Sequence, residues 1–252
     1  MVSAKLTDWI KVRPSRWRRD TNLKTMRGVV QRNGRLLPGL KKQLKDALWP
    51  EYKYKSAPRK TNYGHSPKTG LLIEKQVEDW CKKCKVKDGK YVGLARDPKR
   101  KEARVICGLL VARGWMLVDS QAPVAHGRIG TRLDWVFQGP QGKQFLVELK
   151  TGHNYGLRKA QGNLQRFPAF ANHREQHALM QLTWTWGAIR KRGIELEPIL
   201  MMVNKSAMDK YPTKATVRSI ARKIQKDGSG NLAKPLPKRH RAIADELLSV
   251  FT

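Results

Sequence analysis

Apolar residues at helical spacing mark the predicted helices of this chain. From Leu71 to Trp80 they fall on one face of a helix expected over residues 70–84, with acidic residues between them. Comparable spacing or composition predicts further helices over residues 36–48, 99–113, 172–192, 213–226 and 239–250. Gly114 and Gly193 follow two of these segments, and glycine is a common helix stop.

Short apolar runs between these helices predict strands. The runs cover Trp115–Asp119, Leu133–Phe137, Gln144–Leu149 and Pro198–Asn204. The turn sequence Gly139–Gly142 joins the second and third runs, so we expect them to form a hairpin. Together with the helices, this order predicts an α/β (α+β) fold in which helices flank a small mixed central β-sheet.

The charge of the chain is extreme for a length of 252 residues. There are 52 Lys or Arg against 20 Asp or Glu, and the formal net charge is +32. Such self-repulsion weakens a compact state unless a polyanion relieves it, and nucleic-acid phosphates do so while releasing counterions. We therefore expect DNA as the partner and leave RNA open. A merely soluble basic surface is the simpler alternative.

Other features of the sequence indicate in which cellular compartment we expect the protein. No stretch approaches the roughly 20 apolar residues that span a bilayer, and the N-terminus lacks the apolar segment of a secretory signal. Three cysteines do not suit a disulfide framework. We therefore expect an intracellular protein of a nucleus, nucleoid or virus that is neither secreted nor bound to a membrane. Cys81 and Cys84 have zinc-like spacing but no second pair, and Cys107 is expected to be a small buried residue.

Charge and composition divide the chain into three predicted parts. Residues 66–210 form the expected core, residues 1–65 a basic N-terminal arm and residues 211–252 a basic helical extension. The arm contains a run that combines positive charge with an aromatic ring: Arg16, Trp17, Arg18 and Arg19. This mixture suits phosphate contact and stacking on a base. A solvated tail that orders only on binding is an equally good interpretation.

Acidic and basic residues gather at the predicted hairpin. Asp134 lies just inside its first strand, whereas Glu148 and Lys150 lie two residues apart near the end of its second strand, on one face. The turn would bring both carboxylates and the ammonium to one edge of the sheet. Hard oxygen ligands suit one or two Mg²⁺ or Mn²⁺ ions, and the Leu149 backbone carbonyl could add a ligand. An ordinary hairpin with salt-bridged charges is the alternative.

This combination suits hydrolysis of a phosphodiester. A divalent cation neutralises phosphate charge and lowers the pKa of a bound water. Lys150 could orient that water, help to deprotonate it and stabilise the developing charge. Carboxylates at the end of apolar strands would be unfavourable without a cation between them.

The motifs Arg132-Leu-Asp134 and Glu148-Leu-Lys150-Thr-Gly152 resemble the core of the PD-(D/E)XK nuclease superfamily, most closely its RecB-like and lambda-exonuclease-like branch. The resemblance covers about residues 70–205 and implies a restriction-endonuclease-like core. It also implies that Gln181, on the helix after the lysine strand, holds the attacking water or the substrate phosphate. An acidic residue of the first core helix often joins the metal ligands, which makes Glu74 a tentative ligand and Glu78 its competitor.

Further residues near these motifs are candidates for contact with nucleic acid. They are Arg128, Arg132, His153, Tyr155 and His177. Gly127–Gly130 lacks the Lys and Ser/Thr of a P-loop and is expected to shape the approach to Asp134. His177 could equally be a structural histidine. Thr185 stands where the branch usually has an aromatic residue, and the flanking tryptophans leave the helix register open.

These features together predict a Mg²⁺-dependent deoxyribonuclease acting in replication, recombination or repair of the DNA of a cell, a virus or a mobile element. The alternative is a non-catalytic or partner-dependent DNA-binding or packaging protein on the same fold. The sequence leaves open whether such a nuclease cuts from ends or internally, and which oligomeric state it has.

Overall fold

The computed structural model describes residues 29–30, 36–48, 67–151, 174–203, 208–209, 218–219, 222 and 249–250. Several predicted contact residues lie outside these ranges, namely Arg16, Trp17, Arg18, Arg19, His153 and Tyr155. Most of the two predicted C-terminal helices also lies outside; of the first, the structure describes only Arg218, Ser219 and Arg222, which are helical. The predicted division into an arm, a core and an extension stays a prediction.

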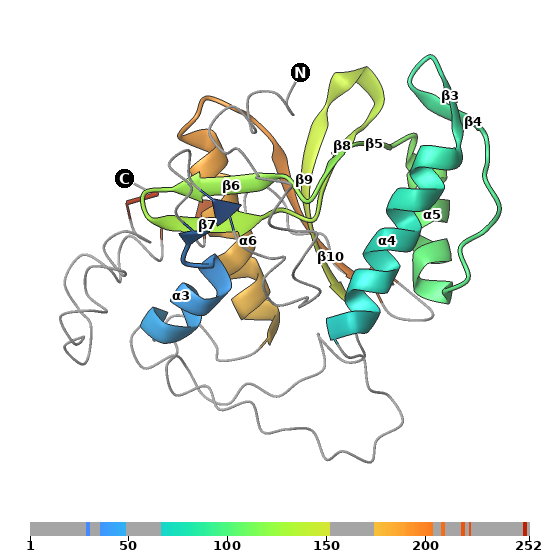
Figure 1. Ribbon diagram of the computed structural model, residues 1–252. Coiled ribbons are helices and arrows are strands. Elements are labelled where there is room, and N and C mark those ends of the chain that lie inside the picture. Colours follow the sequence, from blue (N-terminus) through green and yellow to red (C-terminus); the bar gives the residue numbers. More distant parts are fainter. Residues whose placement is uncertain are drawn as a thin grey trace, which may run out of the picture.

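A five-stranded mixed sheet forms the centre of the described fold (Figure 1). Its order is β11 (Met208–Asp209), β10 (Glu197–Val203), β9 (Gln144–Thr151), β8 (Trp135–Gln138) and β5 (Met116–Ser120). β9 and β10 run parallel, and the other neighbouring pairs are antiparallel. This arrangement confirms the predicted small mixed sheet and the predicted hairpin of β8 and β9.

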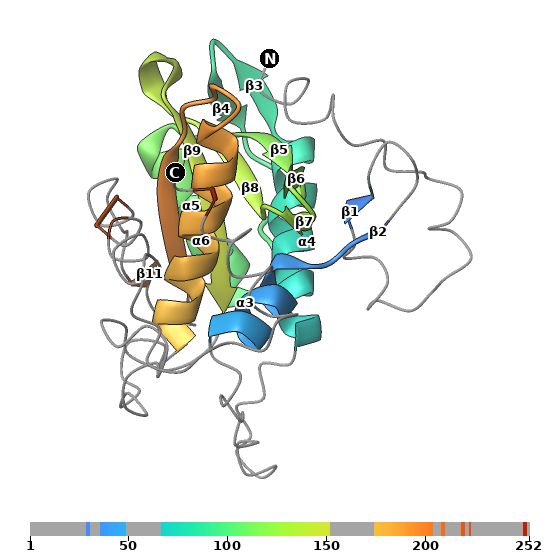
Figure 2. The same cartoon turned by 90° about the vertical axis from the view of Figure 1, so that its left-hand side faces the viewer.

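Helices cover both faces of this sheet. α4 (Pro67–Lys83) and α5 (Lys101–Arg113) lie on one face, and α6 (Arg174–Arg190) lies on the other (Figures 1 and 2). The α6 side also holds α3 (Leu40–Leu48) and the hairpin of β6 (Pro123–His126) and β7 (Ile129–Arg132). The mixed fold with flanking helices is therefore confirmed. Among the described residues, no helix has the length and apolar character needed to cross a membrane.

The two hydrophobic cores are separated by the sheet, and β9 contributes to both. Phe145, Val147 and Leu149 face the core formed with α4 and α5, whereas Leu146 faces the core formed with α6. This alternation follows from the pleat, which sends successive side chains to opposite faces. Glu148 and Lys150 therefore share the α6 face with Leu146.

Helix ends agree with the sequence where a clear stop signal exists. α5 ends at Gly114, whose φ of 61° is left-handed and whose N–H bonds to the carbonyls of Leu110 and Val111. The helix predicted from residue 36 instead begins at Leu40. β2 (Leu36–Leu37) pairs with β1 (Val29–Val30) because Pro38 disfavours helical geometry in the residue before it.

Besides the β1–β2 pair, two hairpins were absent from the prediction. β3 (Lys85–Lys87) and β4 (Lys90–Gly93) form one, and β6 and β7 form the other, with Gly127 and Arg128 in its turn. The second hairpin also corrects the position of Asp134, which lies in a bend before β8 rather than inside that strand. The chain leaves β7 and enters the sheet at this bend.

Candidate active site

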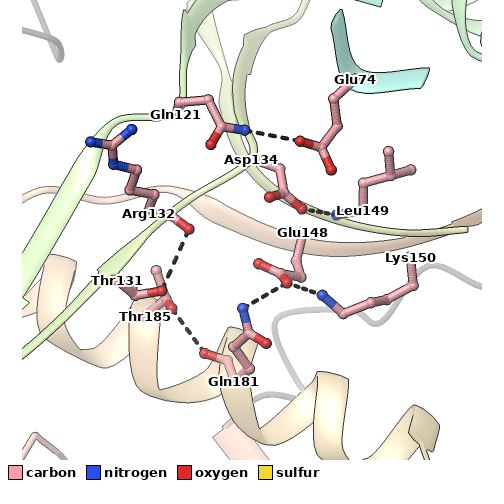
Figure 3. Close-up of polar contacts among 10 residues, drawn as sticks. All are labelled: Glu74, Gln121, Thr131, Arg132, Asp134, Glu148, Leu149, Lys150, Gln181 and Thr185. Carbon is pink, nitrogen blue, oxygen red and sulfur yellow. Dashed lines mark hydrogen bonds and ion pairs between the residues drawn. The ribbon is translucent and has the colours of Figure 1, made fainter. Parts of the chain in front are cut away.

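Asp134 is held beside β9 by hydrogen bonds on both sides of its bend. Its carbonyl accepts a bond from the Gln121 N–H at 3.0 Å, and its Oδ2 accepts one from the Leu149 N–H at 2.6 Å (Figure 3). The last paired residues of the hairpin are Trp135 and Val147, so Asp134 lies opposite Glu148, just beyond the ladder. The predicted hairpin therefore does bring the two acidic residues together.

The bond to Asp134 also fixes the direction of the Leu149 peptide groups. The N–H and C=O of one strand residue point toward the same neighbouring strand. Because the Leu149 N–H points to Asp134, the Leu149 carbonyl faces the Asp134 side as well. This is the orientation that the predicted carbonyl ligand requires.

Glu148 is the buried centre of the site. Only 3% of this residue is exposed. Its Oε1 accepts hydrogen bonds from the Lys150 ammonium, two residues along β9, and from Gln181 Nε2 on α6 at 2.7 Å (Figure 3). Strand and helix thus supply the donors that a buried carboxylate needs. Three of the predicted catalytic residues are in direct contact.

Burial and nearby negative charge raise the pKa of Asp134 well above its ordinary value. Although the whole residue keeps some solvent exposure, its carboxyl group lies deep among neighbouring atoms, and this desolvation is the largest cause. Glu148 and Glu74 raise the pKa further, while Lys150 and the Leu149 N–H lower it. The site therefore carries more negative charge than its own cation and hydrogen bonds neutralise.

Glu74 approaches this site from α4 and is held by a residue that the sequence did not single out. Its Oε2 accepts a hydrogen bond from Gln121 Nε2 at 3.2 Å. Gln121 has a φ of 55°, an uncommon conformation for a residue other than glycine. Through its backbone it binds Asp134 and through its side chain Glu74, so it connects the sheet with α4. No pattern in the sequence at this position predicts such a role.

Glu78, one turn along α4, contacts a different residue from Glu74. Its Oε1 accepts a hydrogen bond from the indole N–H of Trp135 at 3.3 Å, and burial raises its pKa. Glu74, not Glu78, is among the groups that influence the pKa of Asp134. Of the two acidic candidates on α4, Glu74 is therefore the one beside the site.

The register of α6 is now defined by hydrogen bonds and burial. Thr185 Oγ1 donates to the carbonyl of Gln181 at 2.9 Å, one turn earlier. Trp184 and Trp186 are buried in the core on the α6 side of the sheet. His177, one turn before Gln181, is also buried. The aromatic residues next to Thr185 thus serve packing, and Gln181 is the residue of this helix that donates to Glu148.

The two arginine candidates of the β6–β7 hairpin differ in exposure. Arg128 is exposed in the turn. Arg132 is partly buried at the end of β7, and desolvation lowers its pKa. In Figure 3 its guanidinium points away from the carboxylates. The structure therefore does not bring either arginine onto the carboxylates, and their contact with nucleic acid stays a prediction.

The donor atoms around Asp134 are those that a hard divalent cation prefers. Within the described part of the chain, no three His, Cys, Asp or Glu side chains form a group ready to hold a metal ion. Asp134, Glu148 and the Leu149 carbonyl nevertheless supply only oxygen atoms, and a cation would relieve the charge that raises the pKa of Asp134. The residues present therefore fit a Mg²⁺ or Mn²⁺ ion that takes its other ligands from water and substrate.

The three cysteines belong to the core rather than to a site. All three are free and buried: Cys81 lies on α4, Cys84 directly follows it, and Cys107 lies on α5. Burial raises the pKa of Cys81 to about 11 and also raises that of Cys107, so both thiols stay protonated near neutrality. Buried, protonated thiols of this kind are unreactive.

Comparisons with protein families and with curated proteins found no match for this chain. The resemblance to PD-(D/E)XK nucleases therefore rests on the motifs themselves, and the functional interpretation rests on the geometry of the site.

Proposed function

We propose that this protein is a metal-dependent nuclease that hydrolyses phosphodiester bonds of DNA. One observation carries the proposal: Asp134, Glu148, Lys150 and Gln181 come from a bend, a strand and a helix and meet at one place. A structural hairpin would not need a buried carboxylate, a second carboxylate with a raised pKa and a lysine at the same point.

The order of elements supports a restriction-endonuclease-like core. Helices α4 and α5 are followed by β5, β8 and β9, then by α6 and finally by β10 parallel to β9. This is the order in which the motifs of the PD-(D/E)XK superfamily are expected. The proposed family and the proposed site thus agree with one another.

Asp134, Glu148 and the Leu149 carbonyl would hold the cation. When bound, the ion neutralises charge on the phosphate and makes water a better nucleophile. The chain prepares this site in advance, because the Leu149 N–H orients Asp134 and Gln181 orients Glu148. A site whose ligands are already oriented needs little rearrangement when it binds the ion.

Lys150 and Gln181 act on the reacting groups. Both donate to Glu148, and both have further N–H donors for an attacking water or for a phosphate oxygen. The Lys150 ammonium stabilises negative charge that develops on the phosphate, and it orients the water by hydrogen bonding. Gln181 keeps the Glu148 carboxylate in place while this occurs.

The proposed substrate follows from charge. A net charge of +32 favours a polyanion, and the phosphodiester is the bond that a site of this composition hydrolyses. RNA carries the same phosphates, so it belongs in the test. The sequence contains no recognisable base-reading module, so we propose cutting without strong sequence preference.

The test is cleavage of labelled linear and circular DNA, and of RNA, by the wild type and by Lys150→Ala. Reactions contain Mg²⁺, Mn²⁺ or EDTA. We expect the wild type to cut only with a divalent cation, and Lys150→Ala to bind with wild-type affinity without cutting. Cleavage of circular DNA would identify an endonuclease. Cleavage that survives EDTA, or an active Lys150→Ala, would contradict the proposal.

A second candidate is a non-catalytic or partner-dependent DNA-binding or packaging protein. The net charge of +32 favours it, because an enzyme must release its product and strong phosphate binding slows release. It predicts tight, salt-sensitive binding by the wild type and by Lys150→Ala, with no cleavage by either protein under any metal condition.

A further inference from the structure

The β3–β4 hairpin is a second basic feature, outside the candidate active site. It follows α4 directly and stands beyond the C-terminal end of that helix (Figure 1). Five exposed lysines lie within this short segment, two at the end of α4 and three on the hairpin, with Asp88 as the only acidic residue among them. We call these residues the lysine strip: Lys82, Lys83, Lys85, Lys87 and Lys90.

The hairpin has a defined shape. Asp88 and Gly89 form its two-residue turn with φ of 49° and 73°, and positive φ at both positions is typical of the type I′ turn that suits a twisted ribbon. Lys85 lies opposite Gly93, and the missing side chain of this glycine leaves room for the stem of Lys85. The strip is therefore presented by a two-stranded ribbon with a tight turn, whose register shifts once, between Lys85 and Val86.

Tyr91 anchors the hairpin to the core. Its hydroxyl accepts a hydrogen bond from the Leu117 N–H at 3.1 Å, and its ring packs edge-on against Trp80 with the centroids 5.3 Å apart. Cys84 Sγ also accepts a bond from the Ala95 N–H, just after the hairpin. Because both ends are fixed, the lysines lose less conformational freedom on binding than they would on a free tail.

Apolar side chains are exposed on both faces of the ribbon: Val92 shares the lysine face with Lys90, whereas Val86 lies on the face of Tyr91, its partner across the ladder. Val86 is 53% exposed, Val92 60% and Leu94 58%. Lysine on an exposed ribbon can serve simply to prevent pairing with other strands. That explanation does not require several branched apolar residues to stay uncovered beside the lysines. Their combination suits a partner that offers phosphates together with apolar sugar and base edges.

We infer that the lysine strip binds the phosphodiester backbone of the same duplex that the candidate active site cuts. This inference rests on the proposed function. α4 connects the two places, since it carries Glu74 in its first half and Lys83 at its end. With a rise of about 1.5 Å per residue, Lys83 lies about 14 Å along the helix from Glu74. One duplex turn spans about 34 Å, so a single turn can reach both.

The strip differs from the active site in what it contributes. Asp88 is the one acidic residue along the strip, which lies about 14 Å along α4 from Glu74. The lysine strip therefore strengthens DNA binding and positions the duplex. The rate of bond cleavage in the bound complex depends on the active site. Removing it should raise KM and leave kcat unchanged.

The first test is the variant Lys85→Gln, Lys87→Gln, Lys90→Gln in the full chain. Its matched control is Lys99→Gln, Lys101→Gln, Arg104→Gln, which removes three exposed cations near the start of α5. Duplex DNA binding is measured at several salt concentrations. We expect the hairpin variant to lose roughly 10- to 100-fold in affinity at 0.1 M salt and its salt slope to fall by about 2 to 3. Equal losses in the control would show an effect of net charge and overturn the inference.

The second test places a photo-crosslinking residue at Val92, on the lysine face, with Val111 on α5 as the control. Both valines are exposed, so neither substitution disturbs the core. We expect a strong crosslink to duplex DNA from position 92 and a weak one from position 111. Equal yields would overturn the inference. So would a hairpin variant that loses binding to polyglutamate as strongly as it loses DNA, because the strip would then be a general anion surface.

These results are separable from the proposed function. If the wild type binds through the hairpin but does not cut, the proposed nuclease activity fails, while the contact between the lysine strip and duplex DNA stands. If the wild type cuts and the hairpin variant binds and cuts as the wild type does, the inference fails and the proposed function stands.

Discussion

The two faces of β9 differ in character although both are covered by helices. Toward α4 and α5 the strand presents Phe145, Val147 and Leu149, which are all apolar. Toward α6 it changes from Leu146 to Glu148 and Lys150. A strand between two helix layers needs only apolar side chains for stability. The comparison teaches that one face of β9 stabilises the fold, while the other keeps charges that stability alone would not select.

The largest expected effect comes from the charged face. Glu148→Gln keeps the volume and the acceptor for Lys150 and Gln181, but it removes the carboxylate. We expect cleavage to fall by about 10³-fold or more, because a charge at the reacting centre is lost. Single-turnover rates at saturating Mg²⁺, with circular dichroism as a folding control, measure this. A rate near that of the wild type would remove Glu148 from the site.

The apolar face should behave in the opposite way. Val147→Ala removes two buried methyl groups, and we expect the free energy of unfolding to fall by about 2 kcal/mol. Cleavage per folded molecule should stay at the wild-type value. Urea unfolding combined with activity in the native baseline tests both statements. Loss of activity without loss of stability would mean that the two faces are not separate in function.

Replacing Asp134 should change how the stability of the folded protein depends on pH. Its raised pKa means that the folded protein holds this ionised carboxyl at a cost when no metal is present. In EDTA at pH 7 we expect Asp134→Asn to be more stable than the wild type, by about 1 kcal/mol or more. As the pH falls toward 4, the folded wild type takes up the proton before the unfolded chain does, so its stability rises relative to the variant.

Thermal unfolding of both proteins across this pH range provides the measurement. A stability difference that does not change with pH would show that the Asp134 carboxyl is not the titrating group. Mg²⁺ should stabilise the wild type and have little effect on Asp134→Asn, since the variant lacks a charged ligand.

The smallest effect on stability is expected for Gln121, which links Asp134 to Glu74 on α4. Gln121→Ala and Gln121→Gly both remove the hydrogen bond to Glu74, but only glycine relaxes the positive φ. We expect the glycine variant to be more stable than the alanine variant by about 0.5–1 kcal/mol. Both should need more Mg²⁺ for half-maximal stabilisation. If neither variant changes the Mg²⁺ requirement, Gln121 supports only the fold.

Much of the strand arrangement could be predicted because local signals were strong. The glycine turn between β8 and β9 fixes the register, and the register alone places Asp134 beside Glu148. Gly114 ends α5 as expected. The β3–β4 hairpin escaped prediction although Asp88-Gly89 is a known turn signal, because the lysines around it hide the alternation of a strand.

Other parts of the site depend on tertiary contacts that no local pattern encodes. Glu74 and Glu78 lie one helical turn apart, and only packing decides that Glu78 binds Trp135. Gln121 adopts its left-handed backbone because the chain must turn between β5 and β6, and its contact with Glu74 joins distant segments. The short strands β6 and β7 contain glycine and proline, which sequence patterns associate with loops.

The parallel pairing of β9 with β10 affects how the protein is made. While the chain leaves the ribosome, β9 remains an edge strand until residues 197–203 follow and dock beside it. Every side chain of the proposed site, from Glu74 to Gln181, is therefore synthesised before the strand that completes the sheet around it. Pairing of strands so distant along the chain forms slowly. The proposed cutting activity therefore requires that residues 197–203 have been synthesised and have docked beside β9.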